Sequence, residues 1–285
     1  MKVVITGSSG FIGSHLTQAL KKIRGIDIVP FDRSVHSLFD PKSMQSLFEG
    51  SQIVFHLSGA NRAAPHEVMR VNVIGTLNVL EAMRQTTSSD IRLIFLSSFQ
   101  VYRPTSERIV IDEFFPLEPE TLYGISKKMA EDLIGFYGFP SIIFRPSNIY
   151  GPKCRPYYNS VISTFCDLIV KGDTLTLNGT GEQKRDFLYV EDVVDVLLKA
   201  MEYEVKGVQA FNLCSGKLTT LNEVIETLKI ISGKEIRIIR TPIREDNRCI
   251  KGNNEKAKRM LNWSPQVGLR EGLEHTYMWF KRGNR

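Results

Sequence analysis

KVVITGSSGFIG (residues 2–13) predicts the class of fold to which the whole chain belongs. Its first five residues are mostly apolar and β-branched, which is typical of a strand buried on both faces. Three spaced glycines follow, and a helical stretch with apolar residues at Leu16 and Leu20 begins at Ser14. A strand, a glycine turn and a helix in this order are the context in which a glycine motif indicates dinucleotide binding.

Each glycine of this turn has a separate expected role. Gly7 permits the tight turn, Gly10 lets the backbone come close to a pyrophosphate, and Gly13 lets the helix pack against the strand. Phe11 and Ile12 lie between Gly10 and Gly13, directly before the expected helix, whose free N–H groups would bind the phosphates. These five residues are therefore predicted to bind the cofactor.

An acidic residue follows the second expected strand, which covers residues 27–31 and ends at Asp32, nineteen residues after Gly13. A carboxylate at this place accepts hydrogen bonds from the adenosine ribose hydroxyls. Arg33 would suit the 2′-phosphate of NADP, but Asp32 would repel that phosphate. NAD is therefore the favoured cofactor, and NADP is the alternative. A flavodoxin-like sheet with an incidental glycine turn is the competing interpretation, which the agreement of strand, glycines, helix and acid disfavours.

Length and composition exclude several classes of protein. A chain of 285 residues allows one large core or two packed lobes. No apolar run reaches the ~18 residues of a membrane span, and the absence of a signal-peptide pattern predicts a cytoplasmic protein. The four cysteines are scattered without metal-ligand spacing, so we expect free thiols and no metal. The net charge of +6 comes without a basic run, which favours an anionic small molecule over nucleic acid.

Further motifs follow in order along the chain: HLSGA (56–60), NVIGTLNVLEA (72–82), LSSFQVY (96–102), YGISK (123–127), RPSNIYGP (145–152), GTGEQKRDFLYVED (179–192) and LNWSP (261–265). With the GxxGxxG spacing of the first turn, they resemble the extended short-chain dehydrogenase/reductase family of nucleotide-sugar epimerases, dehydratases and reductases. The resemblance covers nearly the whole chain. YxxxK alone would arise by chance, whereas this many motifs in the right order would not.

The expected architecture is α/β, a doubly wound parallel sheet of the Rossmann type with a smaller α+β substrate lobe. Residues 1–150 form the NAD(P)-binding domain, to which the chain returns at about 187–203, and residues 151–285 mainly form the substrate lobe. The expected strands include residues 2–6, 27–31, 52–57, 92–97 and 142–146. The resemblance also implies a homodimer in which helices near 66–85 and 121–137 pair.

The resemblance implies a catalytic set of Ser98, Tyr123 and Lys127. Tyr123 would move the hydroxyl proton of the substrate, and Lys127, one helical turn later, would lower the pKa of that phenol and contact the nicotinamide ribose. Ser98 would orient the substrate oxygen. It is preferred to Ser97 because it stands four residues before Tyr102, as in the family pattern.

Other cofactor contacts are implied by the same motifs. The backbone of HLSGA would lie along the cofactor, Asn72 would lie near it, and the RPSNIYGP segment leads from the cofactor domain to the substrate lobe. The residues implied are Leu57, Ser58, Gly59, Asn72 and Pro146.

The substrate is expected to be a nucleotide-diphosphate sugar. Arg185, in a glycine-rich loop, would bind the diphosphate in a bidentate manner, with Asp186 orienting the loop. Asn148 would donate its amide to the same group. Arg244 falls where the family has RxGD, but the glycine and the acid are replaced, so a solvated surface arginine is the competing interpretation.

The reaction is expected at a sugar carbon, and C4 of the sugar is favoured. Two departures from the family pattern indicate which reaction takes place there. Phe99 and Gln100 replace the acidic pair of dehydratases, which excludes a dehydratase. The segment between Asp32 and Asp40 is short, and Ser37 replaces an acid that typical epimerases place beside the adenosine. Weaker wrapping of the cofactor favours a 4-keto-sugar reductase over the alternative, a nucleotide-sugar 4-epimerase. A non-catalytic regulatory or RNA-binding member of the fold is the remote alternative.

Overall fold

The computed structural model describes residues 1–32, 36–86, 91–242 and 248–283. Its strands are β1 (Lys2–Thr6), β2 (Asp27–Pro30), β3 (Ile53–His56), β4 (Arg92–Leu96), β5 (Val110–Ile111), β6 (Ser141–Pro146), β7 (Asn148–Tyr150), β8 (Leu175–Asn178), β9 (Lys184–Tyr189), β10 (Val208–Leu213), β11 (Leu218–Thr220), β12 (Ile238–Thr241) and β13 (Lys251–Gly252). Its helices are α1 (Phe11–Leu20), α2 (Pro41–Phe48), α3 (Pro65–Met69), the π-helix η1 (Arg70–Ile74), α4 (Gly75–Arg84), the 3-10 helix η2 (Phe99–Val101), α5 (Leu122–Tyr137), α6 (Val161–Lys171), α7 (Val190–Glu202), α8 (Leu221–Ser232), α9 (Glu255–Leu261) and α10 (Leu269–Lys281).

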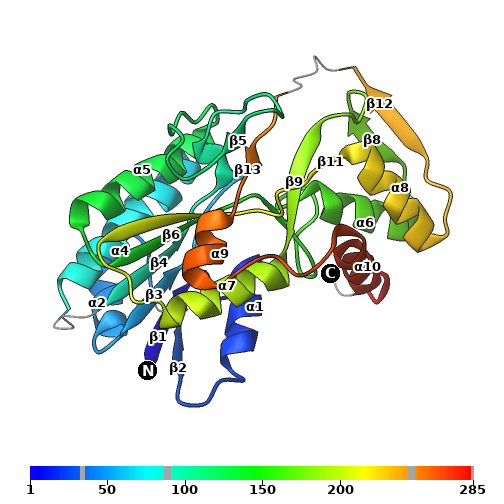
Figure 1. Cartoon of the computed structure of the whole chain (residues 1–285). Helices are drawn as coiled ribbons and strands as arrows, with labels where there is room; N and C mark the ends of the chain where they lie inside the picture. The colour runs from blue at the N-terminus through cyan, green and yellow to red at the C-terminus, as the bar shows by residue number, and fades with distance from the viewer. Residues whose placement is uncertain (33–35, 87–90, 243–247, 284–285) are drawn as a thin grey trace.

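A six-stranded parallel sheet, in the order β10-β6-β4-β3-β1-β2, forms the centre of the first lobe (Figure 1). Alternate residues of each strand face opposite sides. In β1, Val3 and Ile5 pack with α1 and α7, whereas Val4 packs with α2 and α4. Both faces are therefore covered, as a parallel sheet requires. The predicted doubly wound parallel sheet is confirmed.

The chain re-enters this sheet at a place that was not expected. β10 lies at the sheet edge beside β6, although it was not among the strands predicted from the sequence. α7 also packs against α1, but β9, which precedes it, belongs to a separate sheet of order β11-β9-β7. Residues 151–285 thus contribute an edge strand and helices to the first lobe.

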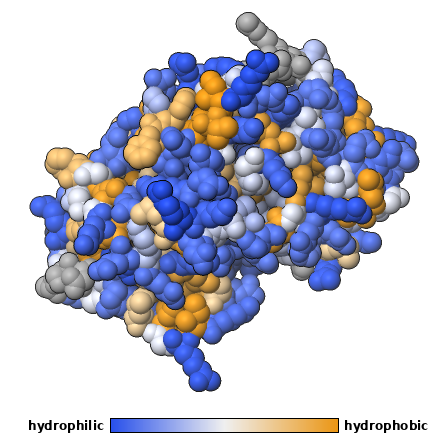
Figure 2. All heavy atoms as spheres, in the orientation of Figure 1, coloured by the Kyte–Doolittle hydropathy of each residue, from blue (hydrophilic) through white to orange (hydrophobic). Residues whose placement is uncertain are grey.

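The second lobe has a core of its own, built from α6, α8, α10 and the small sheets β11-β9-β7 and β12-β8. Figure 1 shows it to the right of the main sheet. Hydrophilic residues cover most of the face seen in Figure 2. Among the described helices, none is both long enough and apolar enough to cross a membrane.

Candidate functional site

A cavity of about 670 Å³ lies where β1, β3, β4 and β6 end and the second lobe begins. Ligands of open parallel sheets bind at the carboxyl ends of the strands, so this is the expected place for a cofactor. The cavity is lined by most of the residues that the sequence predicted for the site: Gly7, Gly10, Phe11, Ile12, Gly13, Leu57, Gly59, Ser98, Tyr123, Lys127, Pro146, Asn148 and Arg185.

The glycine turn forms a wall of bare backbone. Gly7 has a φ of 74°, and its carbonyl accepts a hydrogen bond from Gly10 N at 2.9 Å. A Cβ at Gly13 would lie 2.1 Å from Gly7 O, so α1 packs directly on this turn as well as on β1. Gly10 is the N-cap of α1 and brings no side chain to cap it. This cradle fits the pyrophosphate of a dinucleotide, because the first N–H groups of a helix have no partner within the helix and the three glycines carry no Cβ.

Tyr123 and Ser98 are brought together by the start of α5. Thr121 caps the helix by accepting a hydrogen bond from Gly124 N at 3.0 Å. A Cβ at Gly124 would lie 2.0 Å from Gln100 O, so the first turn of α5 packs tightly on η2. The Ser98 side chain then lies close enough to the Tyr123 phenol to lower its pKa, against the effect of burial. Ser97 instead turns to Glu131, whose carboxylate accepts a hydrogen bond from Ser97 Oγ.

Lys127 is buried, and its Nζ donates to Leu96 O at 2.9 Å and lies 5.9 Å from the ring centroid of Tyr123. Burial lowers the pKa of Lys127 to about 8, against the charge of Glu131, which raises it. Burial also raises the pKa of Tyr123 to about 12, with Tyr158 adding to the rise and Ser98 opposing it. Burial thus determines the direction of the Tyr123 pKa here, and Lys127 is not among the groups that shift it, so the lowering expected from Lys127 stays a prediction.

Three of the predicted cofactor residues do not line the cavity. Asn72, in η1, is buried behind the wall, where its amide holds both backbone polar groups of Ala60 at 2.8 Å and donates to Ser126 Oγ at 2.8 Å. Ser58 is buried, and its N–H donates to Thr6 Oγ1. Asp32 is exposed beyond the end of β2. Arg33, the neighbouring candidate, lies outside the described residues.

Asp186 connects the chain segments on the substrate side of the cavity by hydrogen bonds. This buried carboxylate accepts hydrogen bonds from Ser147 Oγ at 2.7 Å, Ser215 N at 2.9 Å and Gly216 N at 2.8 Å. The amide of Asn148 donates to the Asp186 carbonyl at 2.9 Å, so Asn148 is already engaged with the protein. Arg185 directly precedes Asp186 on β9, and this exposed residue lines the cavity.

Several residues that line the cavity were not predicted, among them Gln100, Arg155, Tyr158, Asn159 and Arg248. Arg248 makes a bidentate contact with Glu120, at 2.8 and 3.1 Å. It reaches the cavity because β13 pairs with β5, a contact between distant segments that spacing does not reveal. Arg244, the predicted arginine of this stretch, lies outside the described residues.

Comparison with known proteins identifies the family of this chain. A sequence model of the NAD dependent epimerase/dehydratase family matches residues 3–214. The chain belongs to this family. One relative, UDP-glucuronic acid decarboxylase 5 of Arabidopsis thaliana, is 30% identical, with 96% of this chain and 87% of that protein covered.

Solved structures of other family relatives cover all or nearly all of both chains. The UDP-glucose 4-epimerase of Thermotoga maritima, solved with UDP-glucose, has 29% identity and a TM-score of 0.87 over 100% of each chain. The UDP-glucose 4-epimerase of Thermus thermophilus, in complex with NAD, has 27% identity and a TM-score of 0.88 over 100% of each chain. RMD of Pseudomonas aeruginosa, complexed with NADPH, has 26% identity and a TM-score of 0.90 over 99% of each chain.

These findings confirm the resemblance to NAD-dependent nucleotide-sugar enzymes and the prediction of NAD as cofactor. They support the alternative 4-epimerase better than the reductase that the short segment after Asp32 favoured. The named relatives include epimerases and decarboxylases, so family membership does not by itself determine the reaction.

His56 is fully buried at the end of β3, directly before the segment 57–60 of this protein, part of which lines the cavity. His56 Nδ1 lies 2.7 Å from Thr6 Oγ1, and Nε2 lies 3.0 Å from Thr76 Oγ1. Because the Thr76 hydroxyl donates to Asn72 O at 2.6 Å, it accepts from Nε2, which places the single proton of His56 there. Burial, with the charge of Lys127, lowers the pKa of His56 to about 3.

Folding stability should therefore fall as the pH falls from 6.5 towards 3. The unfolded chain protonates His56 near its ordinary pKa of 6.5, whereas the folded chain keeps it neutral. This difference costs about 1.4 kcal/mol of unfolding free energy at pH 5.5 and almost nothing above pH 7.5. Urea unfolding at both pH values should show a smaller loss in His56→Gln than in the wild type. An equal loss in the two proteins would contradict this.

Proposed function

We propose that this chain is an NAD-dependent 4-epimerase of a nucleotide-diphosphate sugar. The observation that carries the proposal is the composition of one cavity. The bare glycine turn, the Ser98–Tyr123 pair, Lys127 and the guanidinium groups of Arg185 and Arg248 all line it. A dinucleotide, a carbinol carbon and a diphosphate can therefore be held in one space.

The protein groups account for the movement of the proton. Inverting a carbinol carbon requires removal of its hydroxyl proton and its hydride, and return of the hydride to the opposite face. When bound, NAD supplies the acceptor and donor for the hydride. Tyr123 takes the hydroxyl proton and gives it back, while Ser98 orients the oxygen. Since the pKa of Tyr123 is about 12, a positive charge must come close to it before it acts as a base.

Retention of the cofactor is needed for epimerisation, and the contacts of the short segment after Asp32 support it. The Leu38 carbonyl accepts a hydrogen bond from Asn78 at 2.8 Å, and the Arg70 guanidinium lies 3.8 Å over the ring of Phe39. The Ser37 hydroxyl accepts a hydrogen bond from Phe39 N. This part of the segment is thus tied to η1 and α4 rather than loosely attached, although it is short.

The test is turnover of candidate sugar nucleotides by purified protein without added cofactor. Because the named relatives act on or bind UDP-glucose and UDP-glucuronic acid, these are the first candidates. We expect interconversion of C4 epimers, followed by proton NMR, with no net production of NADH. Stoichiometric consumption of added NADH or NADPH with a 4-keto sugar nucleotide would contradict epimerisation and support a reductase.

The proposal includes a homodimer formed through η1 and α5. Leu122, Ile125, Met129 and Phe136 lie along one stripe of α5, and all are exposed, Phe136 at 85%. Ile74, also exposed, lies on the neighbouring η1. A contiguous apolar stripe on an exposed helix is typical of a protein interface.

Light scattering should give a mass of twice 32.4 kDa for the wild type. Replacing Ile125 and Met129 together with lysine should give monomers of 32.4 kDa, because charged groups would be buried unpaired at the interface. A monomeric wild type at micromolar concentration would contradict the dimer.

A further inference from the structure

A buried ion pair lies next to the site without lining its cavity. Arg145 Nη2 contacts Glu131 Oε2 at 2.6 Å, and Arg145 Nε lies 3.1 and 3.2 Å from the two carboxylate oxygens. The two side chains are only 7% and 4% exposed. Burying two charges is costly, and a buried pair is weak evidence for stability alone.

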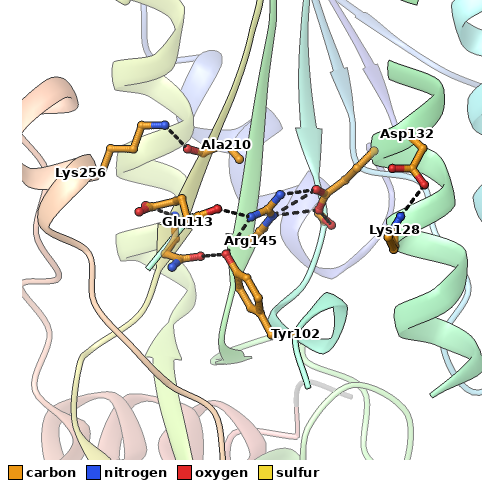
Figure 3. A network of polar contacts seen from close by, with 10 residues as sticks. Tyr102, Glu113, Lys128, Asp132, Arg145, Ala210 and Lys256 are labelled. Carbon is orange, nitrogen blue, oxygen red and sulfur yellow. Dashed lines mark hydrogen bonds and ion pairs between the residues drawn. The ribbon is translucent and has the colours of Figure 1, made fainter. Parts of the chain in front are cut away.

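The pair is connected to the loop that carries Glu113. Arg145 Nη1 donates to Tyr102 OH at 2.8 Å, and that hydroxyl donates to Asn212 Oδ1 at 2.8 Å. The Asn212 N–H in turn donates to Glu113 Oε1 at 2.8 Å. Figure 3 shows Arg145 at the centre of this network, close to Tyr102 and Glu113.

Glu131 also binds the chain directly after β4, where Ser97 leads to Ser98. It lies one helical turn after Lys127 on α5, so both side chains point to the same side of the helix. Lys127 Nζ binds the carbonyl of Leu96, and Glu131 binds the hydroxyl of Ser97. Two consecutive residues of the strand end are thus held by two consecutive turns of α5, immediately before Ser98.

The charges around Lys127 come from few groups. His56 faces it from β3, Tyr123 and Glu131 from α5, and Arg145 lies behind Glu131 on β6. With a pKa of about 3, His56 is neutral in the working range, and with a pKa of about 12, Tyr123 is neutral there as well. The ion pair of Glu131 and Arg145 therefore supplies the charged groups of this set that face Lys127.

We propose that Glu131 and Arg145 form a positioning unit that keeps Lys127 in its ammonium form and fixes the strand end that carries Ser98. The Glu131 carboxylate opposes the effect of burial on Lys127. Arg145 takes up most of the hydrogen-bonding capacity of that carboxylate, so Lys127 remains directed at Leu96 instead of forming an ion pair with Glu131. The inference rests on the proposed binding of NAD by Lys127.

The experiment measures NADH affinity by fluorescence between pH 6 and pH 10, which requires no sugar turnover. In the wild type, affinity should fall as Lys127 loses its proton above about pH 8. We call this fall in affinity at high pH the alkaline limb. Glu131→Gln keeps the shape of the side chain but removes its negative charge, so the alkaline limb should move down by about one pH unit. Arg145→Met leaves the negative charge unpaired, so the limb should move up by a similar amount. A structural defect would not move the two limbs in opposite directions.

A matched control is available on the next residues of the same helix. Lys128 Nζ and Asp132 Oδ2 form an ion pair of 2.7 Å with the same spacing of four residues, but it lies on the exposed side of α5 (Figure 3). Asp132→Asn should leave the limb at the wild-type pH, because solvent screens this pair.

The outcomes separate this inference from the proposed function. Loss of the limb in Lys127→Met assigns it to Lys127, and an unchanged limb there would contradict the NAD-binding role of this lysine. If the limb belongs to Lys127 but does not move in Glu131→Gln, or moves in the same direction in both variants, the positioning unit is wrong. If Glu131→Gln does not fold, the upward shift in Arg145→Met is still required.

Discussion

Replacing Tyr123 with phenylalanine is expected to lower turnover at least about 10²-fold, while the affinity for NAD stays close to that of the wild type. The variant removes only the hydroxyl that moves the proton. The ring stays at the start of α5, where tight packing of Gly124 on Gln100 holds it. Steady-state rates and cofactor titrations would check both halves of the expectation.

A second phenol in the cavity provides the control for this variant. Tyr158 also lines the cavity, and its hydroxyl accepts a hydrogen bond from Asn61 N at the long distance of 3.4 Å. Tyr158→Phe should lower turnover less than about tenfold, because a single weak hydrogen bond is lost. Near-normal turnover in Tyr123→Phe would mean that another group moves the proton.

Gly13→Ala is expected to weaken NAD binding at least about tenfold and to destabilise the fold by about 1–3 kcal/mol. The new Cβ would lie 2.1 Å from Gly7 O and 2.8 Å from Gly7 C, both backbone atoms. The glycine turn would therefore have to move away from the helix N-terminus. Isothermal titration with NAD and urea unfolding would measure the two effects.

Gly135→Ala is the matched control, since it adds the same methyl group to another helix. A Cβ at Gly135 meets no atom within 4 Å. This variant should raise stability by up to about 1 kcal/mol, because alanine favours the helix more than glycine does, and it should leave NAD binding unchanged. Equal behaviour of the two alanine variants would contradict the role assigned to the turn.

The sequence predicts those features that contiguous residues encode. β1, the glycine turn and α1 follow one another in the chain, so their spacing alone brings Gly7 and Gly13 into contact. Tyr123 and Lys127 lie one turn apart on one helix for the same reason. Continuous burial along β1, with successive residues packing on opposite faces, follows from the pleat of a strand in a sheet that is covered on both faces.

Features that depend on contacts between distant segments could not be predicted in this way. Arg248 meets Glu120 across 128 residues, and only the pairing of β13 with β5 brings them together. β10 is identified as a strand of the main sheet only by its register with β6. The pKa of Tyr123 depends on how deeply α5 and the second lobe bury it, and the direction of Lys127 depends on the Leu96 carbonyl.

In the proposed 4-epimerase reaction, one carbon is oxidised and reduced again in this cavity by a hydride that is never released. A nucleotide sugar labelled with deuterium at C4 tests it most directly, with the product analysed by NMR and mass spectrometry. We expect a C4 epimer that keeps the deuterium at C4, even in the presence of excess unlabelled NADH. A product that has lost the label, or deuterium found in the free NADH pool, would contradict it.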